Sequence, residues 1–268
     1  MLKAIPSNSN HAPDQEANSK KLRLVVLESP YDNLDEKLTQ ELFSKLVALK
    51  IKGYRSREYA YGVLPVDATD YVATHFIVCK EENDTFTPLY GQRSISLRRC
   101  QVHHLTFPLL NLAQSCKSDQ HSEAIRDIVG RCEKNGVRLS YESSVTIHPD
   151  VKNNPELLKT IRGLLVANVV LYHRSVGTEE MLGLAAVKFK IDRVFTQLGF
   201  ETIKSNGQDL TNLIVPSYDN AEVKVMHHKN GFPKEVIEYS KDYLSYWNER
   251  IWIRGDLESE NEEKLKAA

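Results

Sequence analysis

Four charged residues stand at spacings that favour a small polar site. Asp67 and Asp70 form a D-x-x-D pair, which can bind a substrate ammonium group or cap a turn. Arg57 and Arg93 are candidate ionic partners for this pair. A buried cluster of carboxylate and guanidinium groups is costly unless its charges are well paired, so such a cluster indicates either a binding site or a scaffold.

Glu142 is a second candidate for a catalytic residue. It lies within a predicted strand over residues 137–147, just before a loop that leads into a helix. A carboxylate that faces a cleft can take a proton from an amine nucleophile, so Glu142 is a candidate general base. The alternative is a solvated strand glutamate with no catalytic part.

The loop over residues 148–154 opens a strongly marked helix. Asn154 is a favoured N-cap, and Pro155 occupies the favoured first helical position. The free N–H groups and the dipole of such a terminus attract anions. Three cations accompany this start, Lys152, Lys159 and Arg162. Because Pro155 lacks a donor and Glu156 repels anions, the segment does not favour a tight pyrophosphate cradle, and it can also be an ordinary crossover.

Other catalytic patterns are missing from the sequence. It has no P-loop, no G-x-G-x-x-G, no H-E-x-x-H and no nucleophile elbow. The pairs His103-His104 and His227-His228 are adjacent, so their side chains diverge in regular structure, and we expect no metal site. The four cysteines show no CxxC spacing and are expected to be reduced thiols.

Charge and hydropathy exclude several classes of protein. The 268 residues include 35 Lys and Arg and 36 Asp and Glu, so the net charge of -1 gives no global attraction to nucleic acid. No stretch approaches the roughly 18 apolar residues of a membrane span. The N-terminus is polar and lacks the apolar core of a signal peptide. We therefore expect a cytoplasmic protein with no membrane span and no nucleic-acid partner.

The elements that must hold these residues alternate between strands and helices. Apolar runs predict strands over 22–27, 71–79, 86–97, 137–147, 183–189, 200–203 and 223–227. Helical spacing predicts helices over 34–50, 107–113, 122–133, 155–173, 191–198 and 234–252. The sequence thus predicts a disordered tail over 1–20, one mixed-sheet α/β (α+β) domain over 21–230, and a C-terminal helical extension over 231–268.

Two segments resemble the GNAT acyltransferase superfamily. VTIHPDVKNNPELLKTIRGLL, at 145–165, is similar to the strand, acyl-donor loop and helix of that superfamily. RVFTQLGFETI, at 193–203, is similar to its helix and following strand. The resemblance implies a mixed central β-sheet flanked by helices.

The upstream half narrows this resemblance. REYAY at 57–61, DATD at 67–70, YGQRS with Arg93 and SYESS with Glu142 occur in that order. The order is similar to that of acyl-homoserine-lactone synthases and long-chain N-acyl amino acid synthases. The lactone synthases usually carry an acidic residue where Pro65 stands and an arginine where Val145 stands.

The resemblance implies an N-acyltransferase that moves a fatty acyl group from acyl-ACP or acyl-CoA to a small amine such as an amino acid. Acyl carrier protein would be a transient partner, docking on bases that include Arg98 and Arg99. Glu142 would act as the base, while amides near Thr146, Ile147 and His148 would polarise the thioester carbonyl. The implied acceptor residues are Arg57, Tyr61, Asp67, Asp70 and Arg93. The implied donor-binding residues are Lys152, Asn154, Lys159 and Arg162.

A homoserine-lactone-type signal synthase and a non-catalytic acyl-binding or scaffold protein are the alternatives.

Overall fold

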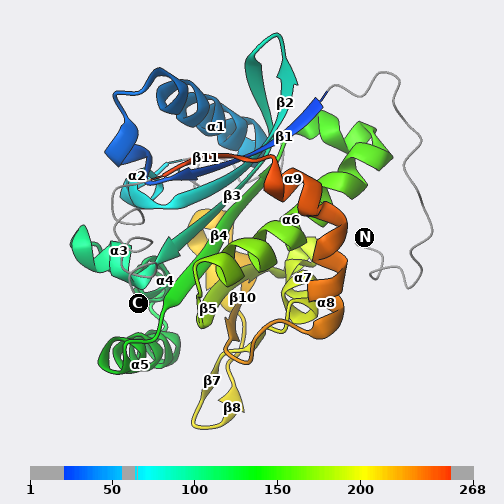
Figure 1. Ribbon diagram of the computed structural model, residues 1–268. Helices are drawn as coiled ribbons and strands as arrows, with labels where there is room; N and C mark the ends of the chain where they lie inside the picture. The colour runs from blue at the N-terminus through cyan, green and yellow to red at the C-terminus, as the bar shows by residue number, and fades with distance from the viewer. Residues whose placement is uncertain (1–20, 56–63, 65, 255–268) are drawn as a thin grey trace, which may run out of the picture.

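The computed structural model describes residues 21–55, 64 and 66–254 (Figure 1). A nine-stranded mixed sheet runs through this part of the chain in the order β11-β1-β2-β3-β4-β5-β10-β6, with β9 also paired to β10. Its strands are β1 (Lys21–Glu28), β2 (Thr74–Glu82), β3 (Thr85–Ser96), β4 (Leu139–Ile147), β5 (Glu180–Ala186), β6 (Glu201–Thr202), β9 (Leu213–Val215), β10 (Ala221–His228) and β11 (Ile251–Ile253). A separate hairpin joins β7 (Lys204–Ser205) to β8 (Gln208–Asp209).

Helices cover both faces of the sheet. They are α1 (Lys37–Arg55), α2 (Ala68–Val72), α3 (Leu97–Val102), α4 (Pro108–Ser115), α5 (Asp119–Asn135), α6 (Pro155–Ser175), α7 (Ile191–Gln197), α8 (Lys234–Ser240) and α9 (Leu244–Asn248). Short 3-10 turns, η1 (Pro30–Asn33), η2 (Pro149–Asn153), η3 (Val187–Phe189), η4 (Pro216–Tyr218) and η5 (Lys241–Tyr243), connect several of them. The predicted α/β class with a mixed sheet is confirmed. No helix in the described ranges is long and apolar enough to cross a membrane.

The two faces are distinct because successive strand residues point in opposite directions. Leu24 and Val26 of β1 pack in the core cluster that contains α6, α7 and α8 residues. Val25 and Leu27 of the same strand pack instead against α1. We call these two sides the α6 face and the α1 face.

Local sequence explains where the helices flanking the central strands begin and end. Asn154 Oδ1 accepts a hydrogen bond from the Leu157 N–H at 3.1 Å, so it caps α6 as predicted. Gly136 ends α5 with a φ of 66°, a left-handed conformation that glycine adopts without strain. Asp67 and Asp70 form a capping box at α2, a helix that takes the place of the predicted start of a strand at Tyr71.

The C-terminal segment differs from the predicted helix over 234–252. It forms α8, η5 and α9, and then β11 pairs in parallel with β1, so Trp252 lies in a strand. The β-branched Ile251 and Ile253 favour this strand. The Arg250 and Arg254 guanidinium groups stack on the Trp252 ring at 4.2 and 4.3 Å. The segment therefore completes the central sheet as well as covering α6.

Gly163 couples α6 to this C-terminal segment. A Cβ placed at Gly163 would overlap the hydroxyl and ring of Tyr243, whereas nothing lies within 4 Å of a Cβ at Gly130 in α5. We expect Gly163→Ala to lower the free energy of unfolding by about 1–3 kcal/mol through overpacking. The control Gly130→Ala should raise it by up to about 1 kcal/mol, because alanine is the better helix former. Urea unfolding of both variants measures this, and equal effects would contradict the packing assigned to Tyr243.

Candidate active site

The two central parallel strands separate part of the way along their length. β4 and β5 pair from Leu139↔Glu180 to Glu142↔Gly183 and no further. Beyond that point β4 continues against β3 as far as Ile147, and β5 continues against β10 as far as Ala186. The inner edges of both strands therefore leave the ladder just after Glu142, and we call this the splay.

A β-bulge shapes β4 at the start of the splay. Arg93 pairs with Ser143 and Gly91 pairs with Thr146, so Ser144 and Val145 together oppose one residue of β3. Ser144 has a φ of 59°, in the left-handed region that non-glycine residues seldom adopt. Such a bulge re-aims the backbone groups that follow it.

Beyond the bulge, the backbone amides of β4 alternate between its two edges. The His148 N–H donates to the Leu89 carbonyl at 2.8 Å, on the β3 side. In an antiparallel ladder alternate residues bond the same neighbour, so the Ile147 N–H points to the other edge, towards the splay. Of the three residues predicted to polarise a carbonyl, Ile147 thus has its amide on the splay side, while the amide of His148 bonds β3.

Glu142 lies at the vertex of the splay on the α6 face and is only 1% exposed. Its Oε2 accepts a hydrogen bond from Gln92 Nε2 at 2.9 Å. Its Oε1 lies 2.8 Å from Nε2 of His173, a fully buried residue of α6. The predicted base is thus held by two side chains.

The predicted acidic pair forms a buried ion cluster on the α1 face. Arg93 Nη1 donates to Asp67 Oδ1 at 2.9 Å and to Asp70 Oδ2 at 2.8 Å. The other oxygen of Asp70 bonds the ammonium group of Lys50, a buried residue of α1. Both oxygens of Asp70 are therefore occupied by cations, while the Asp67 side chain is 54% exposed.

The ion cluster sets the charge states of its members. Burial alone would raise the pKa of Asp70, but Arg93 and Lys50 lower it to about 2. Burial lowers the pKa of Lys50, and Asp70 opposes that shift. Burial also lowers the pKa of His75 to about 3, so His75 is neutral, and its Nε2 lies 2.7 Å from the Asp70 carbonyl oxygen.

A hydroxyl pair extends the α1 face towards the bulge. The Tyr54 hydroxyl lies 2.7 Å from Ser144 Oγ, and Arg93 Nε donates to Ser143 Oγ at 3.2 Å. Burial raises the pKa of Tyr54, so its phenol stays protonated. The structure thus brings Asp67, Asp70 and Arg93 together beside the bulge.

Glu142 stands on the opposite face from this cluster. Arg93 and Ser143 are paired and bonded side chain to side chain, and Glu142 is the next residue along β4. Because neighbouring strand residues point to opposite faces, β4 separates the carboxylate from the ion cluster. Two of the predicted acceptor residues, Arg57 and Tyr61, lie outside the described residues.

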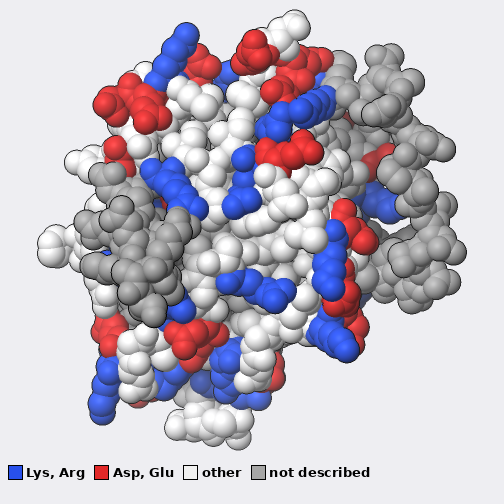
Figure 2. Space-filling model, viewed as in Figure 1, with Lys and Arg blue, Asp and Glu red and all other residues white. Residues whose placement is uncertain are grey.

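The predicted donor residues surround the start of α6. Lys152 and Lys159 are exposed, and Arg162 is half-buried. Asn154 is engaged as the N-cap. Arg99, predicted as a docking base, is instead buried and donates from Nη1 to the Val72 carbonyl at 2.9 Å, so it cannot contribute to a docking surface. Figure 2 shows acidic and basic side chains interspersed over the face that carries α6 and α8.

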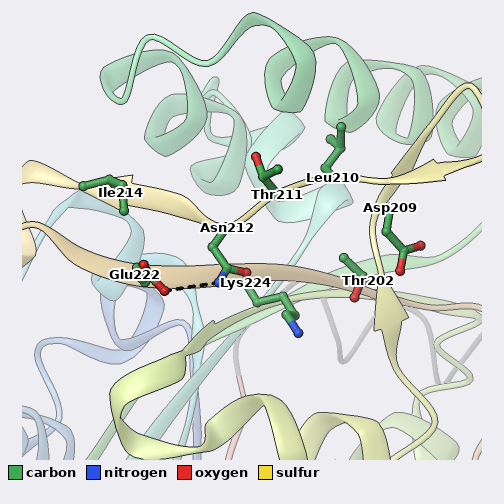
Figure 3. A pocket seen from close by; sticks show the side chains of 8 residues that line it. All are labelled: Thr202, Asp209, Leu210, Thr211, Asn212, Ile214, Glu222 and Lys224. Atoms are coloured by element: carbon green, nitrogen blue, oxygen red, sulfur yellow. Dashed lines mark hydrogen bonds between the residues drawn. The ribbon is translucent and has the colours of Figure 1, made fainter.

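An open groove lies elsewhere, along the outer edge of β10 (Figure 3). β6 pairs with that edge at Met226–His227 and β9 pairs at Ala221–Val223, and the groove lies where they separate. Its lining residues are Thr202, Asp209, Leu210, Thr211, Asn212, Ile214, Glu222 and Lys224. None of the predicted site residues lines it. Across the described ranges, no group of three His, Cys, Asp or Glu side chains is placed to hold a metal ion.

Several residues of these networks were not predicted as site residues, among them Tyr54, Lys50, Gln92 and His173. Lys50 follows Leu46 by four residues on the apolar stripe of α1, which is the one signal that it is buried. His173 likewise follows Val169 by four residues in α6, so its burial could be predicted, whereas its partner could not. Gln92 has no such signal, because its role depends on the pairing of β3 with β4.

The chain resembles known proteins in its structure rather than in its sequence. The sequence matches no protein-family model and no curated protein. BjaI, described as a CoA-dependent acyl-homoserine lactone synthase, is similar in its complex with SAM and isopentyl-CoA. The TM-score is 0.54 at 12% identity, over 87% of this chain and 94% of BjaI. Its complex with MTA gives a TM-score of 0.53, also at 12% identity and with the same coverage. FeeM, an N-acyl amino acid synthase from uncultured soil microbes, gives 0.45 at 9% identity, over 79% of this chain and 93% of FeeM. With its mixed central sheet, its flanking helices and its likeness to BjaI, the chain has a GNAT-like α/β fold.

Proposed function

We propose that the protein is an N-acyltransferase that moves a fatty acyl group from an acyl thioester to the amine of a small metabolite such as an amino acid. The observation that carries this proposal is the splay of β4 and β5, with Glu142 at its vertex and the Ile147 amide on its open edge. The fold shared with an acyl-homoserine lactone synthase supports it.

The reaction follows from these groups. The acceptor amine attacks the thioester carbonyl, and the Ile147 N–H stabilises the negative charge that develops on the carbonyl oxygen. Glu142, directly or through one water, takes the proton that the amine loses. Collapse of the tetrahedral intermediate breaks the carbon–sulfur bond and expels a thiolate. The thiolate takes up the proton held by Glu142, directly or through water, which leaves an amide, a thiol and the ionised carboxylate. Thr146 and His148 hold the strand against β3 on either side of this amide.

The ion cluster supplies the acceptor side in this proposal. Arg93 and Lys50 fix Asp70, and this anchors α2 beside the bulge. Asp67 presents a half-exposed carboxylate, which suits the ammonium or α-amino group of an incoming acceptor. Arg57 and Tyr61 complete the acceptor set proposed from the family resemblance.

The donor side is the start of α6. We propose that the phosphopantetheine arm of acyl-ACP or acyl-CoA enters the splay beside Lys152, Asn154, Lys159 and Arg162. No ion pair joins Lys152, Lys159 or Arg162 to another described residue, so these charges are available to an anionic donor.

Charge reversal tests the donor side. Lys152→Glu combined with Lys159→Glu should raise the KM for the donor several-fold and change kcat little, because exposed charges mainly steer encounter. The rise should shrink as salt increases. Lys241→Glu in the C-terminal segment is the control. Equal KM values in all three proteins would remove these lysines from donor binding.

Thiol release by the purified protein tests the function. Acyl-CoA and acyl-ACP of several chain lengths are combined with a panel of amines that includes amino acids and S-adenosylmethionine. We expect amine-dependent thiol release together with an amide product. Thiol release that no amine accelerates would overturn the proposal. Comparison of the rates with acyl-ACP and acyl-CoA shows which donor the protein uses.

One observation favours a second candidate. Both oxygens of Glu142 accept hydrogen bonds from protein donors, and the side chain is almost fully buried, as in a structural network. A non-catalytic GNAT-like protein that binds acyl groups would show this arrangement. Bound acyl thioester after purification, with no transfer to any amine, would support that candidate.

A further inference from the structure

Two hydrogen-bonded chains converge on the Glu142 carboxylate on the α6 face. In one chain the Tyr90 hydroxyl donates to Gln92 Oε1, and Gln92 Nε2 donates to Glu142 Oε2. In the other, Thr178 Oγ1 lies 2.9 Å from His173 Nδ1, and His173 Nε2 lies 2.8 Å from Glu142 Oε1. Tyr90, Gln92 and Glu142 are each no more than 2% exposed.

With Glu142 ionised and His173 neutral, the states that the role of base requires, the chemistry of the groups fixes the direction of each bond. An ionised carboxylate can only accept, so both Gln92 and His173 must donate to it. A neutral imidazole whose Nε2 carries the proton can only accept at Nδ1, so Thr178 must donate from its hydroxyl. In these states every bond in both chains points towards Glu142.

The backbone holds the outer end of the His173 chain. The Thr178 N–H donates to the His173 carbonyl at 2.9 Å, in the turn between α6 and β5. The hydroxyl of Thr178 is therefore held beside the imidazole by a second, independent bond. Tyr172 packs edge-on against the ring at 5.2 Å.

We propose that His173 is a positioning residue for the transfer reaction: with Thr178 fixing its tautomer, it orients the Glu142 carboxylate at the vertex of the splay. This inference rests on the proposed function, in which Glu142 takes the proton of the amine. A buried Glu–His pair can also be a scaffold that only ties α6 to β4, and the two roles predict different kinetics.

The chain offers a closely matched control. His121 is a buried histidine of α5, and its Nδ1 also lies 2.8 Å from a hydroxyl, that of Ser118. It lies outside the networks around the splay. A loss of kcat that is specific to His173 can therefore be separated from the general effect of removing a buried histidine that is bonded to a hydroxyl group.

The test measures kcat and KM for His173→Leu, His173→Gln, Thr178→Val and His121→Leu. We expect His173→Leu to lower kcat by about 10- to 100-fold, as loss of an orienting partner does elsewhere, with little change in the KM for the donor. Gln can donate to Glu142 from its amide, so His173→Gln should recover most of the activity. Thr178→Val should also lower kcat, but by a smaller factor. This variant tests the proposal if His173→Leu does not fold. His121→Leu should keep the wild-type kcat.

A double-mutant cycle completes the test. If His173 acts through Glu142, His173→Leu should cost nothing further in a Glu142→Gln background. An equal loss in both backgrounds, or a kcat for His173→Leu and Thr178→Val that matches His121→Leu, would overturn the positioning role while leaving the transferase intact. A wild-type protein that transfers no acyl group from any donor would overturn both proposals.

Discussion

Replacing Glu142 with glutamine is expected to lower turnover by about 10²- to 10⁴-fold, the usual contribution of a positioned general base. Glutamine has nearly the same size but cannot accept the proton that the amine must lose. The change is measured as kcat in the thiol-release assay with a saturating donor. Because glutamine also turns an N–H group towards one of two donors, thermal unfolding of the variant must be followed in parallel.

Glu180 provides a matched control for this substitution. It is a mostly buried glutamate of β5 that receives two bonds from Arg131 at 2.7 Å and lies 2.7 Å from His227 Nε2. Glu180→Gln should alter stability and leave kcat unchanged, since its partners lie outside the splay. Wild-type turnover in Glu142→Gln would remove Glu142 from the role of base and favour the non-catalytic reading.

Replacing Asp70 with asparagine is expected to lower the free energy of unfolding by about 3–5 kcal/mol at neutral pH. The variant leaves Arg93 and Lys50 buried without the charge that compensates both, and breaking a buried ion pair from one side has a cost of this size. Urea unfolding measures the change. Glu238→Gln, which breaks the exposed pair with Lys241, is the control and should change stability little.

The stability difference between wild type and Asp70→Asn should depend on pH. The pKa of Asp70 is about 2 in the folded protein, below its ordinary value of 3.8, so the carboxylate binds protons more readily after unfolding. Its stabilisation is therefore complete above about pH 5 and is lost as the pH falls towards 2. The difference between the two proteins should shrink over that range. A difference that stays constant down to pH 2 would contradict the ionised cluster.

The elements whose signals are local could be predicted from the sequence. Asn154 and Pro155 mark the start of α6, because caps depend on a few neighbouring residues. The apolar runs over 71–79 and 86–97 predict strands where β2 and β3 lie. These features need no knowledge of distant contacts.

Features that depend on distant contacts were missed. β11 is three residues long and forms only by pairing with β1 at the other end of the chain. The burial of Lys50 depends on Asp70, since a lysine is seldom buried without a partner. The register that separates Arg93 from Glu142 is set by the pairing of β3 with β4, and a shift of one residue would reverse their faces.

Mass spectrometry of lipid extracts tests whether the protein transfers an acyl group to an amine in cells. Cells expressing the wild-type protein are compared with cells expressing Glu142→Gln at matched protein levels. We expect a new N-acyl product in the wild-type extract that is absent or strongly reduced with the variant, and its mass would identify both substrates. Identical extracts, with acyl thioester bound to both purified proteins and no transfer, would contradict the proposed acyl transfer.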